Sequence, residues 1–138
     1  MDEFLHNAVL ELNPIQARKL IVWCARRAVP TSPSAALDAV NAADAYTKSE
    51  IKYGEMRAFH NAAIDFYSKT HTIELRPWRE LARHDAMNAA LLAKLCTIDD
   101  KHIGIAVQDA IYVLHALEPF DEALAMIAER IQEIKNEA

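Results

Sequence analysis

The fold is decided by residues 13–46, which read NPIQARKLIVWCARRAVPTSPSAALDAVNAADAY. Asn13 and Pro14 are typical of a helix start, because asparagine caps free backbone N–H groups and proline has no N–H to satisfy at the first helical position. Residues 30–33, PTSP, form a corner, and Ser32 is placed to cap the helix that Pro33 begins. The side chains expected to face the core from this second helix are Leu37, Val40 and Ala43. The stretch therefore predicts helices at residues 14–29 and 33–46.

The same order of helix start, helix and short break continues through the chain. Pro77 and Pro119 each precede helix-forming residues, and the segment TKSE at residues 47–50 fits a capping box. The segment TIDD at residues 97–100 begins another helix, because carboxylates favour the positive end of the helix dipole. Residues 69–76 contain β-branched side chains and are the expected loop. The predicted helices occupy residues 2–12, 14–29, 33–46, 48–68, 77–96, 99–117 and 119–138.

Composition indicates one helical domain. The chain has 138 residues, of which 52% are hydrophobic and 25% charged, so it can bury a core of its own and does not have the composition of a disordered protein. Only 2 residues are glycine, which leaves little material for β-turns. We therefore predict a single all-α domain over residues 1–138, with six to seven helices packed as antiparallel hairpins.

Two of the predicted helices carry apolar residues at helical spacing. In the helix at residues 48–68 these residues are Met56, Phe59, Ala63 and Phe66. In the last helix they are Phe120, Leu124, Ile127, Ile131 and Ile134. This second stripe either covers the chain's own core or pairs with a second copy, which would make the protein a self-associating helical scaffold.

The formal net charge of −5 limits the partners that the chain can hold by charge. Proteins that bind a nucleic-acid backbone normally have a basic excess, so a DNA-binding role is the least expected. An acidic chain suits a protein partner with a basic surface. Cys24 and Cys96 lie in apolar runs and are expected to be buried thiols. The acidic N-terminus and the lack of an apolar segment of roughly 20 residues predict no membrane contact and a cytoplasmic location.

One histidine–aspartate pair suggests a metal site. His84 and Asp85 are similar to the paired ligands of the HD metal phosphohydrolases, which are helical and add an upstream histidine and a downstream aspartate. His60 and Asp109 are the candidates for those positions, since imidazole and carboxylate suit a divalent metal that activates water. Arg83, however, precedes the pair where apolar residues normally bury it. A metal-dependent phosphohydrolase is thus the alternative, and a non-enzyme without a cofactor is the expectation, because no glycine-rich phosphate loop is present.

Trp78 and Arg79 form the clearest binding pattern, because tryptophan and arginine are enriched at the centres of protein interfaces. Tyr53 can extend this patch. The acidic residues that could meet a basic partner are Asp38, Asp44, Glu50 and Glu55. The same acids also fit solvent-facing helix surfaces, and Trp78 also fits an aromatic plug over one end of the helices.

The N-terminal half resembles a known family. The run IVWCARRAVP at residues 21–30 is followed by AALDAV at residues 35–40, and then by Glu50 and the run EMRA at residues 55–58. These segments are similar to the all-helical immunity-protein domains encoded beside bacterial toxin genes and in phage genomes. The resemblance covers a third to a half of the chain and ends between Ser68 and Trp78. It implies a protein that binds and blocks another protein, with no catalytic residues. The prediction is a small acidic inhibitor of a toxin or of a host or phage defence enzyme.

Overall fold

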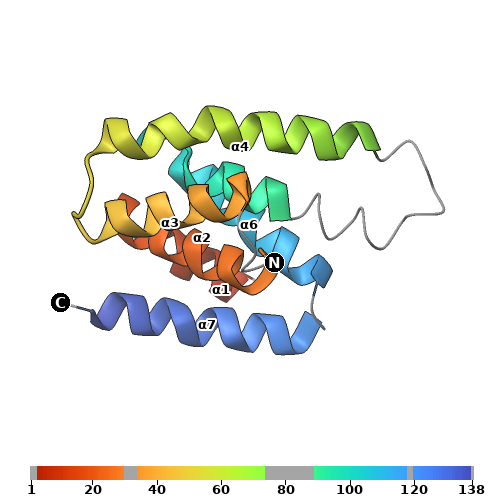
Figure 1. Cartoon of the computed structure of the whole chain (residues 1–138). Coiled ribbons are helices and arrows are strands. Elements are labelled where there is room, and N and C mark those ends of the chain that lie inside the picture. Colours follow the sequence, from red (N-terminus) through yellow and green to blue (C-terminus); the bar gives the residue numbers. More distant parts are fainter. Residues whose placement is uncertain (1–2, 30–33, 74–88, 118–119, 138) are drawn as a thin grey trace.

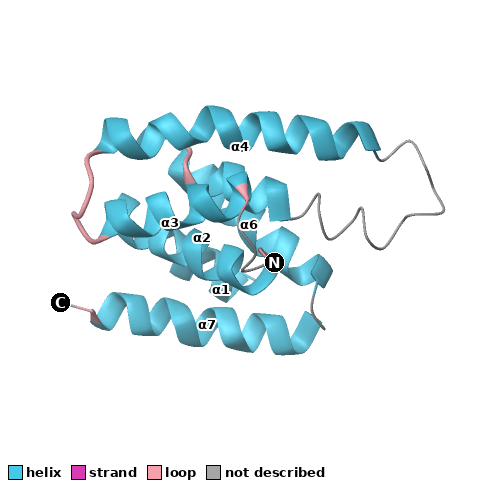
Figure 2. Cartoon of the chain, in the orientation of Figure 1, coloured by secondary structure: helices cyan, strands magenta, loops and turns pink. Residues whose placement is uncertain are grey.

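A computed structural model of the chain describes residues 3–29, 34–73, 89–117 and 120–137. Within these ranges the regular structure is helical and no strand occurs, which confirms the predicted all-α class (Figure 2). Residues 89–96 are helical as well and lead into the turn at residues 97–99. The other helices are α1 (Glu3–Leu10), α2 (Pro14–Ala28), α3 (Ala35–Thr47), α4 (Tyr53–Ile73), the 3₁₀ turn η2 (Asp100–His102), α6 (Ile103–Leu117) and α7 (Phe120–Asn136).

The long helices α4 and α7 lie at opposite edges of the molecule, with α2, α3 and α6 between them (Figure 1). Helix α3 packs antiparallel against α4, and α2 packs against both α3 and α6. Helix α7 closes the other side against α1, α2 and α6. One continuous hydrophobic core draws buried residues from all of these α-helices and from residues 89–96.

The start of α2 is the one that the sequence predicts. The Asn13 side chain accepts a hydrogen bond from the Gln16 N–H at 2.8 Å, and the Gln16 side chain accepts one from the Asn13 N–H at 3.0 Å. This reciprocal capping box satisfies two N–H groups that a helix start leaves without partners. Pro14 follows directly, as expected.

The predicted cap of α3 at Ser32 is wrong. The Oγ of Ser34 accepts the Leu37 N–H at 3.1 Å, and the helix begins at Ala35. Serine occurs at both positions, so composition alone favours neither; Ser34 has the extended backbone of a helix cap, with φ of −165° and ψ of 165°. Residues 30–33 lie outside the described residues.

The capping box predicted at residues 47–50 is also wrong. Helix α3 continues to Thr47, whose hydroxyl donates back to the Asp44 carbonyl at 2.7 Å instead of capping a following helix. Ser49 then adopts a left-handed conformation with φ of 60°, which reverses the chain. Helix α4 begins only at Tyr53. Just before it, the Lys52 N–H donates a hydrogen bond to the Glu55 side chain at 3.1 Å.

Helix α4 differs from its prediction in length and in orientation. It extends to Ile73, so the loop predicted from residue 69 is wrong as far as residue 73, because β-branched residues weaken a helix only slightly. Met56 and Ala63 are buried as predicted, but Phe59 is 38% exposed and His60 takes the inward position. The buried face of this helix therefore runs through Met56, His60 and Ala63.

The apolar stripe of α7 belongs to the chain's own core. Ile127, Ile131 and Ile134 are buried, and Leu124 packs against the core while half-buried. Phe120 begins the helix. The stripe thus fits the first of its two predicted roles, and a second copy of the chain would have to displace this packing to reach the three isoleucines.

Candidate functional site

Arg18 is a fully buried arginine at the centre of the molecule. Its side chain is 0% exposed and donates to the Cys96 carbonyl at 2.6 Å, to the Ile98 carbonyl at 2.7 Å and to Asp100 Oδ1 at 2.9 Å. The Cys96 carbonyl ends the helix at residues 89–96, where the helix dipole is negative, so a cation is favourable there, and the Ile98 carbonyl lies in the turn that follows. The contact fixes α2 to a part of the chain about eighty residues further on.

A second arginine binds the same corner from α4. Arg57 donates to the Thr97 carbonyl at 2.7 Å, and the Nδ1 of His60 lies within hydrogen-bonding distance of the Thr97 hydroxyl, at 2.9 Å. Burial lowers the pKa of His60, and the cations Arg57 and Lys94 lower it further. His60 is therefore neutral at pH 7 and acts as a packed hydrogen-bonding residue. We call Arg18, Arg57, His60, Thr97 and Asp100 the polar corner.

Tyr46 connects the polar corner to α3. Its hydroxyl donates to Asp100 Oδ2 at 3.1 Å, and the Arg18 guanidinium lies 5.4 Å from the centre of its ring. Burial, followed by the hydrogen bond to Asp100, raises the pKa of Tyr46. The ring of Tyr53 packs against Tyr46 with 5.7 Å between ring centres. Tyr53, a predicted interface residue, is thus exposed and packs against a partly buried neighbour.

Sequence reasoning missed Arg18, although a signal was present. Ile21 and Ala25, which follow it at helical spacing, are both buried. A single charged residue on an apolar helix face indicates a buried charge, and buried charges require partners. The identity of the partners has no local signature, because they are backbone carbonyls of a distant turn.

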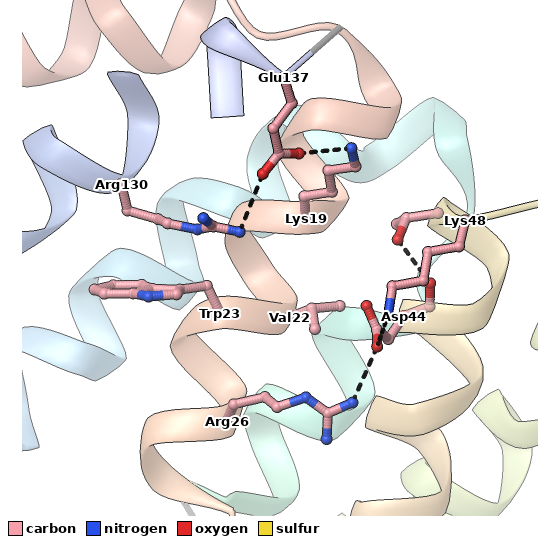
Figure 3. A pocket seen from close by; sticks show the side chains of 9 residues that line it. Lys19, Val22, Trp23, Arg26, Asp44, Lys48, Arg130 and Glu137 are labelled. Atoms are coloured by element: carbon pink, nitrogen blue, oxygen red, sulfur yellow. Dashed lines mark hydrogen bonds and ion pairs between the residues drawn. The ribbon is translucent and has the colours of Figure 1, made fainter. Parts of the chain in front are cut away.

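A hollow lined by four cationic side chains lies where α2, α3 and α7 meet (Figure 3). It has a volume of about 270 Å³ and we call it the charged pocket. Arg26 and Lys48 contact Asp44 at 3.3 and 3.2 Å, and Lys19 and Arg130 contact Glu137 at 2.8 and 3.7 Å. Figure 3 shows Val22 and Trp23 between these two groups of charges. The residues that line the pocket are Lys19, Val22, Trp23, Arg26, Asp44, Thr47, Lys48, Arg130 and Glu137.

The lining of the charged pocket has the opposite sign to the chain. It holds four cationic side chains and two carboxylates, whereas the whole chain has a net charge of −5. The Nε of Arg130 is buried and has no hydrogen-bond partner. The hydrogen bond from Lys19 lowers the pKa of Glu137, so this carboxylate is ionised at neutral pH. The pocket was not predicted, because its cations come from three separate helices.

A second hollow, of about 280 Å³, lies between α3 and α4, and we call it the α3–α4 groove. Apolar side chains form most of its surface, and Phe59 is the largest of them. The residues that line the groove are Asp38, Asn41, Ala42, Ala45, Ile51 and Phe59.

The structure divides the acidic residues that the sequence grouped together. Asp38 lines the α3–α4 groove, and Glu50 is exposed in the turn that follows α3. Glu55 is exposed in the first turn of α4, one helical turn before Phe59. Asp44 instead lies in the charged pocket, where it pairs with Arg26 and Lys48.

The predicted metal ligands are only partly described. His60 is buried in the polar corner and Asp109 is exposed on α6, while His84 and Asp85 lie outside the described residues. In the ranges that the structure covers, no three His, Cys, Asp or Glu side chains are grouped for a metal ion. Trp78 and Arg79, the predicted interface pair, also lie outside the described residues. Cys24 and Cys96 are buried and form no disulfide, as expected.

No protein-family model, curated protein or solved structure matches this chain. The resemblance to immunity-protein domains therefore stays a prediction. Among the helices that the structure describes, none combines the length and the apolar composition that crossing a bilayer requires.

Proposed function

We propose that the protein acts by binding, and that its α3–α4 groove covers a basic surface of a partner protein. The observation that supports this proposal is the position of Phe59. Its ring is 38% exposed and lines the groove, although its spacing from Met56 predicts a buried residue. Aromatic side chains in a hollow are typical anchors of protein interfaces.

The surroundings of Phe59 suit a partner with cationic side chains. Ala42 and Ala45 keep the floor of the groove low, so a side chain of the partner can approach the backbone of α3. Asp38 lines the groove, and Glu50 and Glu55 are exposed nearby in the chain, at the turn and the start of α4. Carboxylates around an apolar centre attract a basic surface during encounter and disfavour acidic partners.

The class of partner follows from the family resemblance. Immunity-protein domains block another protein, so the partner we propose is a toxin or a host or phage defence enzyme with a basic functional surface. Binding alone would inhibit such a partner, because it would cover that surface. The proposal includes a cytoplasmic location and requires no catalysis and no cofactor from this chain. Trp78 and Arg79 remain candidates to extend the interface.

The test compares two similar surfaces of the same protein. Phe59→Ser and Asp38→Lys change the α3–α4 groove. Ile105 is 66% exposed on α6 and Asp109 follows it by one helical turn, so Ile105→Ser and Asp109→Lys are matched changes outside the groove. Circular dichroism checks that each variant is folded.

The tagged variants are used to capture proteins from a native lysate. We expect one basic protein to be retained by the wild-type chain and by both α6 variants, and to be lost from both groove variants. Its retention should weaken steeply with salt, because exposed charges are screened. Equal retention by all variants, or loss only from the α6 variants, would contradict the proposal, as would a wild-type chain that retains nothing.

A further inference from the structure

We propose that the charged pocket binds a small organic anion that carries a flat ring. This site is separate from the α3–α4 groove and does not depend on the proposed protein partner. Three features support it: the charges of the lining, the length of its ion-pair contacts and the exposed part of Trp23.

The ion pairs of the pocket leave positive charge without a counterion. Each carboxylate is shared by two cations: Asp44 by Arg26 and Lys48, and Glu137 by Lys19 and Arg130. Arg130 also contacts Glu133, whose side chain is half exposed and lies outside the lining. The group stays positive even when Glu133 is included, so an anion of one or two charges would neutralise it.

Three of these contacts are long. Charge-assisted N–H···O⁻ hydrogen bonds are normally about 2.7 to 2.9 Å. The contacts to Asp44 are 3.3 and 3.2 Å, and the contact between Arg130 and Glu137 is 3.7 Å. Arg26, Lys48 and Arg130 can therefore donate hydrogen bonds to the oxygens of a ligand without the loss of a strong ion pair.

The wall between the cations is apolar and flat. Trp23 is half-buried, and Figure 3 places its indole between the side chains of Arg130 and Arg26. Val22 lies beside it and is buried. The Arg27 guanidinium lies over the indole, 5.1 Å from the ring centre. A ring on the ligand would therefore pack against the part of the indole that Arg27 leaves exposed. Phosphate without a ring would make the charge contacts only.

The size of the pocket limits the ligand. Sites for drug-sized ligands usually enclose about 300 to 1,000 Å³. The charged pocket, at about 270 Å³, lies just below that range and suits one ring with one anionic group. The anion can be a phosphate monoester or a carboxylate, since both present oxygens to the same donors.

The assay uses Trp23 as its reporter. The chain has 2 tryptophans, Trp23 and Trp78, so Trp78→Phe leaves the indole of the pocket as the only one. The probes are adenosine monophosphate for the phosphate source and phenylacetate, which carries no indole, for the carboxylate source, and calorimetry on the wild-type chain repeats each titration. Adenosine and inorganic phosphate test the charge and the ring separately. We expect at least one of the two anionic probes to bind more tightly than adenosine and inorganic phosphate.

The variants assign any binding to the pocket. Arg26→Gln and Lys48→Gln should each weaken binding by about tenfold or more, since a hydrogen bond to a charged group is worth that much. Lys101→Gln is the control, because Lys101 is exposed in η2 and does not line the pocket. The proposal is overturned if neither anionic probe binds at millimolar concentration, if adenosine or inorganic phosphate binds as well as the anionic probes, or if Lys101→Gln weakens binding as much as Arg26→Gln. If the wild-type chain binds neither probe and Arg26→Gln lowers the free energy of unfolding, the pocket is a structural ion-pair cluster and the proposal is overturned.

Discussion

Replacing Arg18 with methionine should lower the free energy of unfolding by about 3 to 5 kcal/mol. Methionine has a similar length and fills most of the space, so the cost comes from the polar groups that lose Arg18. These groups are the carbonyls of Cys96 and Ile98 and the carboxylate of Asp100. A buried group that loses a charged hydrogen bond costs about 1 to 3 kcal/mol or more.

The cost of Arg18→Met is smaller than the sum of the costs of its three lost hydrogen bonds. Asp100 has a side chain that is 43% exposed, so water can replace part of what Arg18 provides. The Cys96 carbonyl is buried, at the negative end of its helix, and carries most of the loss. A loss of about 4 kcal/mol is large beside the 5 to 15 kcal/mol of total stability that is usual for a domain.

Urea unfolding followed by circular dichroism measures this loss. With a slope of about 2 kcal/mol per molar urea, the midpoint should fall by about 2 M. Arg26→Met is the matched control, because it is the same change on the same helix at an exposed ion pair of 3.3 Å, and should cost less than about 1 kcal/mol.

A double variant separates the ion pair from the helix cap. Arg18→Met with Asp100→Leu removes both charges of the ion pair. If Arg18 stabilised the protein only through this ion pair, replacing both residues with apolar ones would leave the free energy of unfolding unchanged. Because Tyr46 also donates to Asp100, the reference protein and the double variant both carry Tyr46→Phe. We expect the double variant to stay destabilised relative to that reference, because the carbonyls of Cys96 and Ile98 still lack a donor. An Arg18→Met protein as stable as the Arg26→Met protein would refute the reasoning.

Three further predictions test individual contacts. Burial and nearby cations lower the pKa of His60, so the unfolded chain binds more protons than the folded one and the free energy of unfolding should fall as the pH drops below about 6.5. Urea unfolding between pH 8 and pH 5 measures this pH dependence. His60→Asn should flatten it, whereas an unchanged pH dependence in this variant would assign the effect to another group. Ser34→Ala should cost about 1 kcal/mol and more than Ser32→Ala, because Ser34 caps α3; thermal melts of the two variants decide the order. Burial raises the pKa of Cys96 to about 12, and Cys24 is buried too, so a thiol reagent at pH 8 should label both only after unfolding, and rapid labelling of the native protein would show that the core opens.

Local patterns were enough to predict the helix class and several buried positions. The cap at Asn13 and the core residues Val40 and Ala43 of α3 were identified correctly, because caps and helical faces depend on residues within a turn or two. The predictions at Ser32 and at residues 47–50 failed at the ends of α3, where more than one residue can cap and the path of the chain selects among them.

The sequence by itself determined that this protein is helical, with apolar faces that build one core, since those properties follow from spacing along the chain. Tertiary structure alone decided that His60 rather than Phe59 faces inward and that Arg18 binds carbonyls about eighty residues away. It also decided that Arg26, Lys48 and Arg130 surround one hollow. The physical reason is that these arrangements depend on how separate helices pack and on where buried polar groups find partners, and neither is recorded in the residues next to them.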